Sequence, residues 1–126
     1  MQNRFFFIIF SIFLTACQNK IGIDGFNNQD WQKDEYGCQG IRIQLAEELL
    51  AEKTKLLGYN EKEVRDFLGK PDEISLYKRN QKFFKYYVNP SADICDSNAH
   101  NAVVKTLNIK FNATNRSDEV YMEIVH

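Results

Sequence analysis

The stretch YNEKEVRDFLGKPDEISLYKR, residues 59–79, decides the fold because the spacing of its apolar residues changes halfway along it. Its first half predicts a short helix: Asn60 is a candidate N-cap, and Glu63 stands three residues later, as in a capping box. Gly69 suits the left-handed residue that ends a helix, and Pro71 blocks any continuation. The apolar stripe of this predicted helix consists of Val64, Phe67 and Leu68.

Before this stretch, IRIQLAEELLAEKTKLLG (41–58) spaces its leucines among charges as an amphipathic helix does, and Gly58 closes it. After Pro71 the period becomes two, which predicts strands. The predicted strands cover 73–79, 82–89, 102–112 and 120–126. The expected fold is therefore α+β, a two-layer sandwich in which two N-terminal helices pack on a four-stranded antiparallel meander sheet.

Alternation along these strands sorts their side chains onto two faces. The residues expected to face the helices are Ile74, Leu76, Phe84, Tyr86, Val88, Leu107, Ile109, Val120, Met122 and Ile124. Those expected on the opposite face are Tyr77, Phe83, Tyr87, Tyr121 and Val125, with Arg79, Lys85 and Lys105. Aromatic residues among positive charges resemble the centres of protein interfaces. The alternative is that these aromatics only stabilise the sheet through cross-strand pairs.

The chain begins MQNRFFFIIFSIFLTACQNK, in which a nearly unbroken apolar run from Phe5 to Ala16 stops at Cys17. This run is too short to span a bilayer, and Arg4 precedes it, so residues 1–16 are expected to be a signal peptide. Its end, Leu14 to Cys17, resembles the lipobox of bacterial lipoproteins, which implies that Cys17 is lipidated. The alternative is an ordinary signal peptide cleaved nearby, with Cys17 an incidental thiol.

Cleavage before Cys17 would leave 110 residues, enough for one domain. We expect a flexible tether over 17–30, where glycine and asparagine interrupt any periodicity, and a single domain over 31–126. Phe26 and Trp31 could instead fold back onto the sheet. The whole chain has a formal net charge of −1, and so lacks the basic footprint of a nucleic-acid-binding protein.

The order of these elements resembles the SmpA/OmlA (BamE-like) domain of small outer-membrane lipoproteins. The matching residues are Glu63-Val64, Leu68-Gly69, Pro71 and Tyr86 to Val88. The chain is also similar to small lipoproteins of Bacteroidetes, through Trp31, Gly37-Cys38, Leu68 to Asp72 and Cys95. The first resemblance implies a fold shared with β-lactamase inhibitor proteins. Neither resemblance implies catalytic residues.

Two cysteines remain if Cys17 carries lipid. In an oxidising compartment Cys38 and Cys95 are expected to form a disulfide, with free or redox-active thiols as the alternative. A cluster in the loop around Cys95 could ligate a metal, but turn chemistry explains such Asp-rich loops more simply. The residues of this cluster are Asp93, Cys95, Asp96 and His100; the other histidine is His126. We expect no metal and no cofactor.

No phosphate-binding loop, nucleophile elbow or coherent catalytic set is present in the sequence, so we expect a protein that is not an enzyme. The expected function is that of a lipid-anchored periplasmic module that binds another envelope protein through Tyr77, Phe83, Lys85, Tyr87 and Tyr121. Neither nucleic acid nor a small-molecule substrate is expected. Gln18 after the lipidated residue favours the outer membrane, by resemblance to enteric lipoproteins. The alternatives are an inhibitor or immunity-type protein, and an enzyme or metal carrier built on the loop from Asp93 to His100.

Overall fold

The computed structural model describes residues 20–90, 92–95 and 104–125. The expected signal peptide 1–16 and Cys17 lie outside these ranges. So do Asp96, His100 and His126, together with the side chains of Asp93 and Val125.

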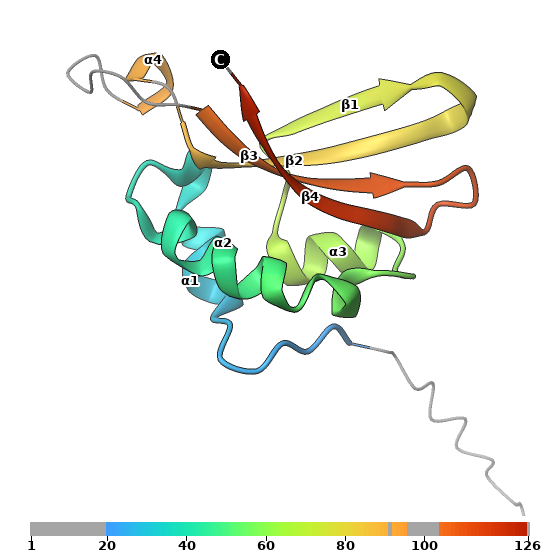
Figure 1. Ribbon diagram of the computed structural model, residues 1–126, viewed down its shortest axis with the longest axis horizontal. Helices are drawn as coiled ribbons and strands as arrows, with labels where there is room; N and C mark the ends of the chain where they lie inside the picture. The colour runs from blue at the N-terminus through green and yellow to red at the C-terminus, as the bar shows by residue number, and fades with distance from the viewer. Residues whose placement is uncertain (1–19, 91, 96–103, 126) are drawn as a thin grey trace, which may run out of the picture.

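Three helices precede the strands, and a short fourth helix lies between the second and third strands. The helices are α1 (Asn28–Lys33), α2 (Ile41–Ala51), α3 (Glu61–Leu68) and α4 (Ala92–Cys95). The strands are β1 (Glu73–Tyr77), β2 (Gln81–Asn89), β3 (Val104–Phe111) and β4 (Ser117–Val125). They form one antiparallel sheet in the order β1-β2-β3-β4, with α1, α2 and α3 together beneath one face (Figure 1). The predicted α+β arrangement is confirmed.

Helix α3 begins and ends close to where its sequence predicts. The Glu63 backbone N–H donates to Asn60 Oδ1 at 2.9 Å, and the Asn60 N–H donates to Glu63 Oε2 at 2.9 Å, which completes the capping box. At the other end Gly69 has a φ of 80°, in the region that favours glycine. Val64 and Leu68 are fully buried against the sheet.

Helix α2 is shorter than predicted because it ends at Ala51 and gives way to the 3-10 helix η2, Lys53–Leu56. The loop that follows is tied to β4 by Ser117. The Ser117 hydroxyl donates to the Leu56 carbonyl at 2.6 Å and accepts from the Tyr59 N–H at 3.0 Å. These bonds fix the loop at the point where a β-bulge shifts the β3–β4 register.

Helix α1 was not predicted, and it brings the preceding residues into the domain. Asn27 caps α1 by accepting from the N–H groups of Gln29 and Asp30, each at 3.1 Å. The chain before it is also packed. The structure thus corrects the expected tether over 17–30: residues 20–30 belong to the domain, and buried residues within this segment are Ile21, Ile23 and Phe26.

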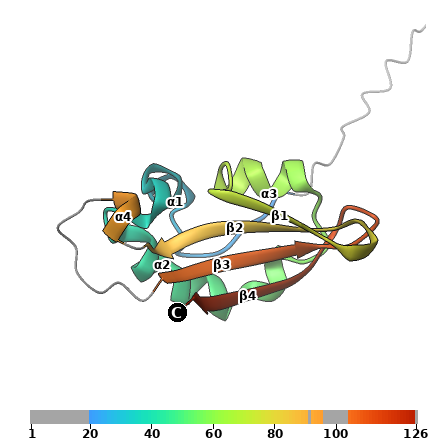
Figure 2. The ribbon, with the colours of Figure 1, turned by 90° about the horizontal axis from the view of Figure 1, so that it is seen from above.

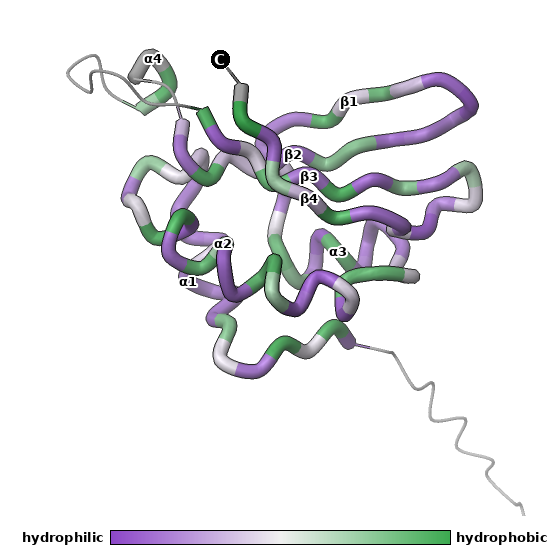
Figure 3. Tube along the Cα trace, in the orientation of Figure 1, coloured by the Kyte–Doolittle hydropathy of each residue, from purple (hydrophilic) through white to green (hydrophobic). Residues whose placement is uncertain are grey.

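The sheet places one face of each strand over the helices, as alternation predicts. Figure 3 shows hydrophobic and hydrophilic residues alternating along the strands, and seen from above the strands run side by side over the helical layer (Figure 2). The helix-facing side chains that are buried are Phe84, Tyr86, Val88, Leu107, Ile109, Phe111 and Val120, and Met122 packs against them.

Three residues expected in this core are exposed. Leu76 is 77% exposed, Ile124 50% and Ile74 44%. Figure 1 shows β1 lifted away from the helical layer by the twist of the sheet, so side chains with helix-facing alternation meet no helix there. Lys82, opposite Leu76 in β2, forms an ion pair with Glu61 of α3 at 2.8 Å, so Leu76 has a charged residue and not an apolar one beside it in β2.

Candidate partner-binding surface

The five residues predicted to bind a partner lie together on the outer face of the sheet. The strand register places Phe83 of β2 opposite Lys110, and Lys85 opposite Asn108, which in turn faces Tyr121 of β4. Tyr77, in β1, contacts Phe83 edge-on with 6.3 Å between ring centroids. Alternation therefore placed these five side chains on one face of the sheet, as predicted.

The charge of this outer face is not the one predicted. We expected aromatics among positive charges, but carboxylates stand between the lysines. Lys85 Nζ lies 3.8 Å from Glu123 Oε2, and Lys110 Nζ lies 3.7 Å from Glu119 Oε2. Lys105 pairs with Ile124 and shares the helix-facing alternation of Leu107, so it does not belong to the outer face. The outer face is a mixed-charge surface with its ion pairs already made.

Hydrogen bonds hold several outer-face side chains in place. The Tyr87 hydroxyl donates to Glu73 Oε2 at 3.0 Å. Beneath the larger side chains Asn108 is fully buried, and its Nδ2 donates to Glu123 Oε2 at 2.8 Å. Such satisfied bonds make the centre of the outer face rigid.

Two tyrosines of this face, Tyr87 and Tyr121, resist ionisation because their pKa values are raised. Partial burial, then the hydrogen bond to Glu73, raises the pKa of Tyr87. Partial burial, then the charges of Glu123 and Glu119, raises the pKa of Tyr121. Both phenols are therefore neutral hydrogen-bonding groups at physiological pH.

Leu76, which was expected to face the helices, is the most exposed large apolar residue in the described part of the chain, and it lies on β1. Tyr77 is 62% exposed, close to Leu76, and among the described strands β1 has only β2 as a neighbour. The 3-10 turn η3 (Lys78–Asn80) joins β1 to β2 with Arg79 at φ 61° and Asn80 at φ 58°. We call the exposed residues Ile74, Leu76 and Tyr77, with this turn, the β1 arm. The sequence carried one sign that Leu76 is not covered by a helix. Lys82, which lies opposite Leu76 in β2, is a charged residue at a helix-facing position.

The start of α2 is held against the sheet by a buried ion pair. Arg42 Nη1 lies 2.7 Å from Asp72 Oδ2, with the two side chains only 2% and 4% exposed. Arg42 Nε also donates to the Trp31 carbonyl at 2.9 Å, and Asp72 Oδ2 accepts from the Tyr87 N–H at 2.8 Å. Since every charge here has a partner, this cluster is structural.

A second buried carboxylate, Asp34, caps α2. Its two oxygens accept from the N–H groups of Gln39, Ile41 and Arg42 at 2.7, 2.8 and 2.9 Å. The carboxylate also suits the positive end of the helix dipole. Gly40, at the N-cap position itself, has no side chain for this role.

Cys38 and Cys95 form the expected disulfide, with their Cα atoms 5.4 Å apart, so the structure favours it over free thiols. Within the described ranges no three His, Cys, Asp or Glu side chains are placed to hold a metal ion. None of the described helices is long and apolar enough to cross a bilayer.

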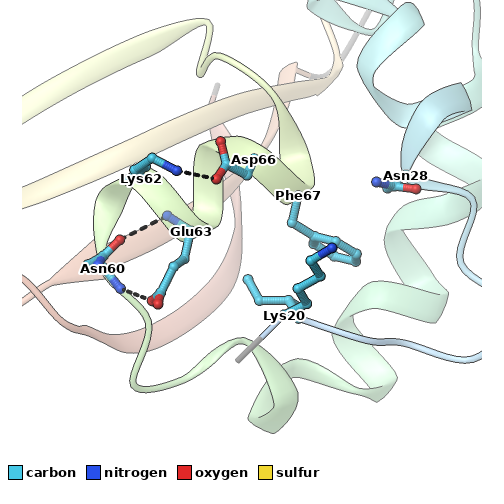
Figure 4. A pocket seen from close by; sticks show the side chains of 8 residues that line it. Lys20, Asn28, Asn60, Lys62, Glu63, Asp66 and Phe67 are labelled. Carbon is cyan, nitrogen blue, oxygen red and sulfur yellow. Dashed lines mark hydrogen bonds and ion pairs between the residues drawn. The ribbon is translucent and has the colours of Figure 1, made fainter. Parts of the chain in front are cut away.

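A pocket of about 590 Å³ lies between the first described residues and α3. Figure 4 shows Lys20 and Phe67 on one side of it and the capping pair Asn60 and Glu63 on the other. Lys62 Nζ donates to Asp66 Oδ2 at 2.8 Å, so these two charges of the rim are paired. The pocket is open and contains no nucleophile–base pair.

The chain matches no protein family, no curated protein and no solved structure.

Proposed function

We propose that this chain is a lipid-anchored protein-binding module on the periplasmic side of the bacterial outer membrane, acting in envelope assembly or maintenance without catalysing a reaction. The lipobox-like end of the signal peptide supports the anchor, and the resemblance to SmpA/OmlA lipoproteins supports the compartment. The disulfide between Cys38 and Cys95 fits an oxidising periplasm.

The exposure of the β1 arm is the observation that best supports the binding function. Leu76 and Tyr77 are large apolar residues that remain exposed at the edge of a sheet, and burying such a side chain contributes roughly 1.5–3 kcal/mol. An edge strand also offers unpaired backbone N–H and C=O groups, to which an extended partner strand can add. The rigid outer face beside the arm supplies Phe83 and Tyr87 as aromatic contacts.

The alternative is an inhibitor or immunity-type protein that blocks an envelope or secreted enzyme. The turn η3 favours it, because Arg79 and Asn80 are exposed at the tip of the arm in left-handed conformations. A tip of this shape can enter the cleft of an enzyme. The two functions share the same surface and differ in the identity of the partner.

Photo-cross-linking in intact cells tests the binding function. A benzoylphenylalanine placed at Tyr77 should give a discrete cross-linked product, and adding Leu76→Lys should abolish it. Leu57→Lys is the control, because Leu57 is an exposed leucine of the helical side. Identifying the product separates the alternatives: an envelope component supports the module, and a hydrolase or toxin supports the inhibitor. A product that persists with Leu76→Lys, or none in either background, would contradict both.

A further inference from the structure

The chain leaves the domain much closer to Cys17 than the sequence suggested. Ile21, Ile23 and Phe26 are 8%, 7% and 9% exposed. The Phe26 ring lies 5.4 Å from the ring of Phe67 in α3 and 5.8 Å from Trp31. Packing therefore fixes the chain from position 21 onward.

This packing leaves only two residues, 18 and 19, between Cys17 and Lys20. Whatever their conformation, three Cα-to-Cα steps reach at most about 11 Å. A tether free from 17 to 30 would have reached roughly 45 Å and allowed any orientation of the domain. A lipid on Cys17 must instead hold the exit point at Lys20 close to the bilayer.

The exit point lies on the far side of the molecule from the β1 arm and the outer face. Figure 1 shows the first described residues running along the side of the helical layer that faces away from the sheet. The pocket beside Lys20 opens there, and its rim belongs to α3 (Figure 4). A helical layer about 10 Å thick separates this side from the sheet.

We propose that the side of the helical layer around Lys20 and α3 rests on the lipid headgroups of the membrane that holds the anchor, so that the outer face of the sheet points into the periplasm. This orientation rests on the proposed function, because it needs the lipid on Cys17. The two positive charges of the pocket rim, Lys20 and Lys62, balance the two negative charges of Glu63 and Asp66, so this side can approach headgroups without strong attraction or repulsion. The short connection between Cys17 and Lys20, and not the charge of this side, sets the orientation of the domain.

The orientation narrows the choice of partner. A protein that binds the β1 arm or the outer face must approach from the aqueous side, as a periplasmic protein or domain does. A partner buried in the same bilayer could not reach that face while the helical layer lies against the lipid.

Quenching from the lipid headgroup tests this orientation in the full lipoprotein. Lys62→Cys and Glu119→Cys carry the same maleimide fluorophore on exposed positions of opposite layers, in phosphatidylcholine vesicles with nitroxide-labelled headgroups. Quenching should be at least about twofold stronger at position 62 than at 119, since headgroups occupy only a thin interfacial zone. It should be the same at low and high salt.

A variant with a longer connection between Cys17 and the domain supplies the control. Inserting about ten Gly and Ser residues between Asn19 and Lys20 should bring the quenching at position 62 down toward that at 119. With the native connection, equal quenching at positions 62 and 119, or stronger quenching at position 119, would overturn the proposed orientation. Mass analysis of the same preparation separates the two proposals: acylated Cys17 with equal quenching overturns the orientation alone, whereas unmodified Cys17 overturns the anchor as well.

Discussion

At the scale of single residues, the buried pair Arg42 and Asp72 is where the molecule is most vulnerable. Asp72→Asn leaves the Arg42 charge buried without its partner, which should cost about 3–5 kcal/mol of unfolding free energy. Asp66→Asn is the matched control, because it breaks the exposed pair with Lys62 and should cost far less. Urea denaturation measures both. Similar small losses would show that the buried pair is dispensable.

Tyr86 links stability to alkaline pH. Burial raises the pKa of this phenol well above its ordinary value, so the unfolded chain loses the proton first as pH rises. The contribution of Tyr86 is therefore complete below about pH 10 and falls above it, by about 1.4 kcal/mol for each pH unit.

The variant Tyr86→Phe isolates this effect. It should flatten the alkaline loss of stability, although Tyr87 and Tyr121, whose pKa values are also raised, leave part of it. Near pH 8 the variant should be less stable by about 1 kcal/mol, because the Gly69 carbonyl loses the hydroxyl 2.8 Å away. Denaturation midpoints across the alkaline range provide the measurement. An unchanged slope in the variant would disprove the assignment to Tyr86.

At the scale of elements, the turn before α2 depends on a glycine that nothing else can replace. A Cβ at Gly37 would lie 2.7 Å from the carbonyl oxygens of Tyr87 and Val88 in β2. Gly40 has nearly the same φ, +74° against +72°, but open space around it. Replacing each of these two glycines by alanine therefore distinguishes the effect of a steric clash from the effect of backbone strain.

We expect Gly40→Ala to lose roughly 1–2 kcal/mol, the usual cost of a left-handed alanine. Gly37→Ala should lose that amount and a further 1–3 kcal/mol, about the cost of overpacking, because β2 must shift. Thermal or urea unfolding of the two variants provides the comparison. Equal losses of stability in the two variants would mean that a Cβ at position 37 does not displace β2.

The elements differ in how far the sequence could predict them, and the reason is the range of their contacts. Helix α3 carries its own cap, stripe and stop signal, and the strands carry their own alternation, so local patterns sufficed. Helix α1 and the segment after it depend on Asp34 reaching α2 and on Arg42 reaching Asp72. Such contacts leave no periodic signature in the sequence.

The candidate partner-binding surface could also be predicted only as far as it follows from local sequence patterns. Alternation placed Phe83, Lys85 and Tyr87 on one face, because the period of a strand is fixed. It could not show that Glu73 and Glu123 stand beside them, which requires the strand register. The exposure of Leu76 was also beyond it, since the twist of the sheet decides where the helices stop covering β1.

At the scale of the whole molecule, the disulfide joins the turn before α2 to α4, two segments that are far apart in the sequence. Cys38 and Cys95 are 57 positions apart, and closing a loop of that size stabilises a domain by roughly 4 kcal/mol on the chain-entropy model. The double variant Cys38→Ala/Cys95→Ala should lose most of this amount in urea denaturation. Reductant should lower the stability of the native protein and leave the double variant unchanged. A double variant as stable as the native protein would refute this role.

The anchor determines everything proposed about location, orientation and partner, and the mass of the N-terminal peptide from native membranes tests it most directly. We predict a chain that begins at Cys17 and carries a thioether-linked diacylglycerol. A chain that still begins at Met1, or one with a free Cys17 thiol, would contradict the account.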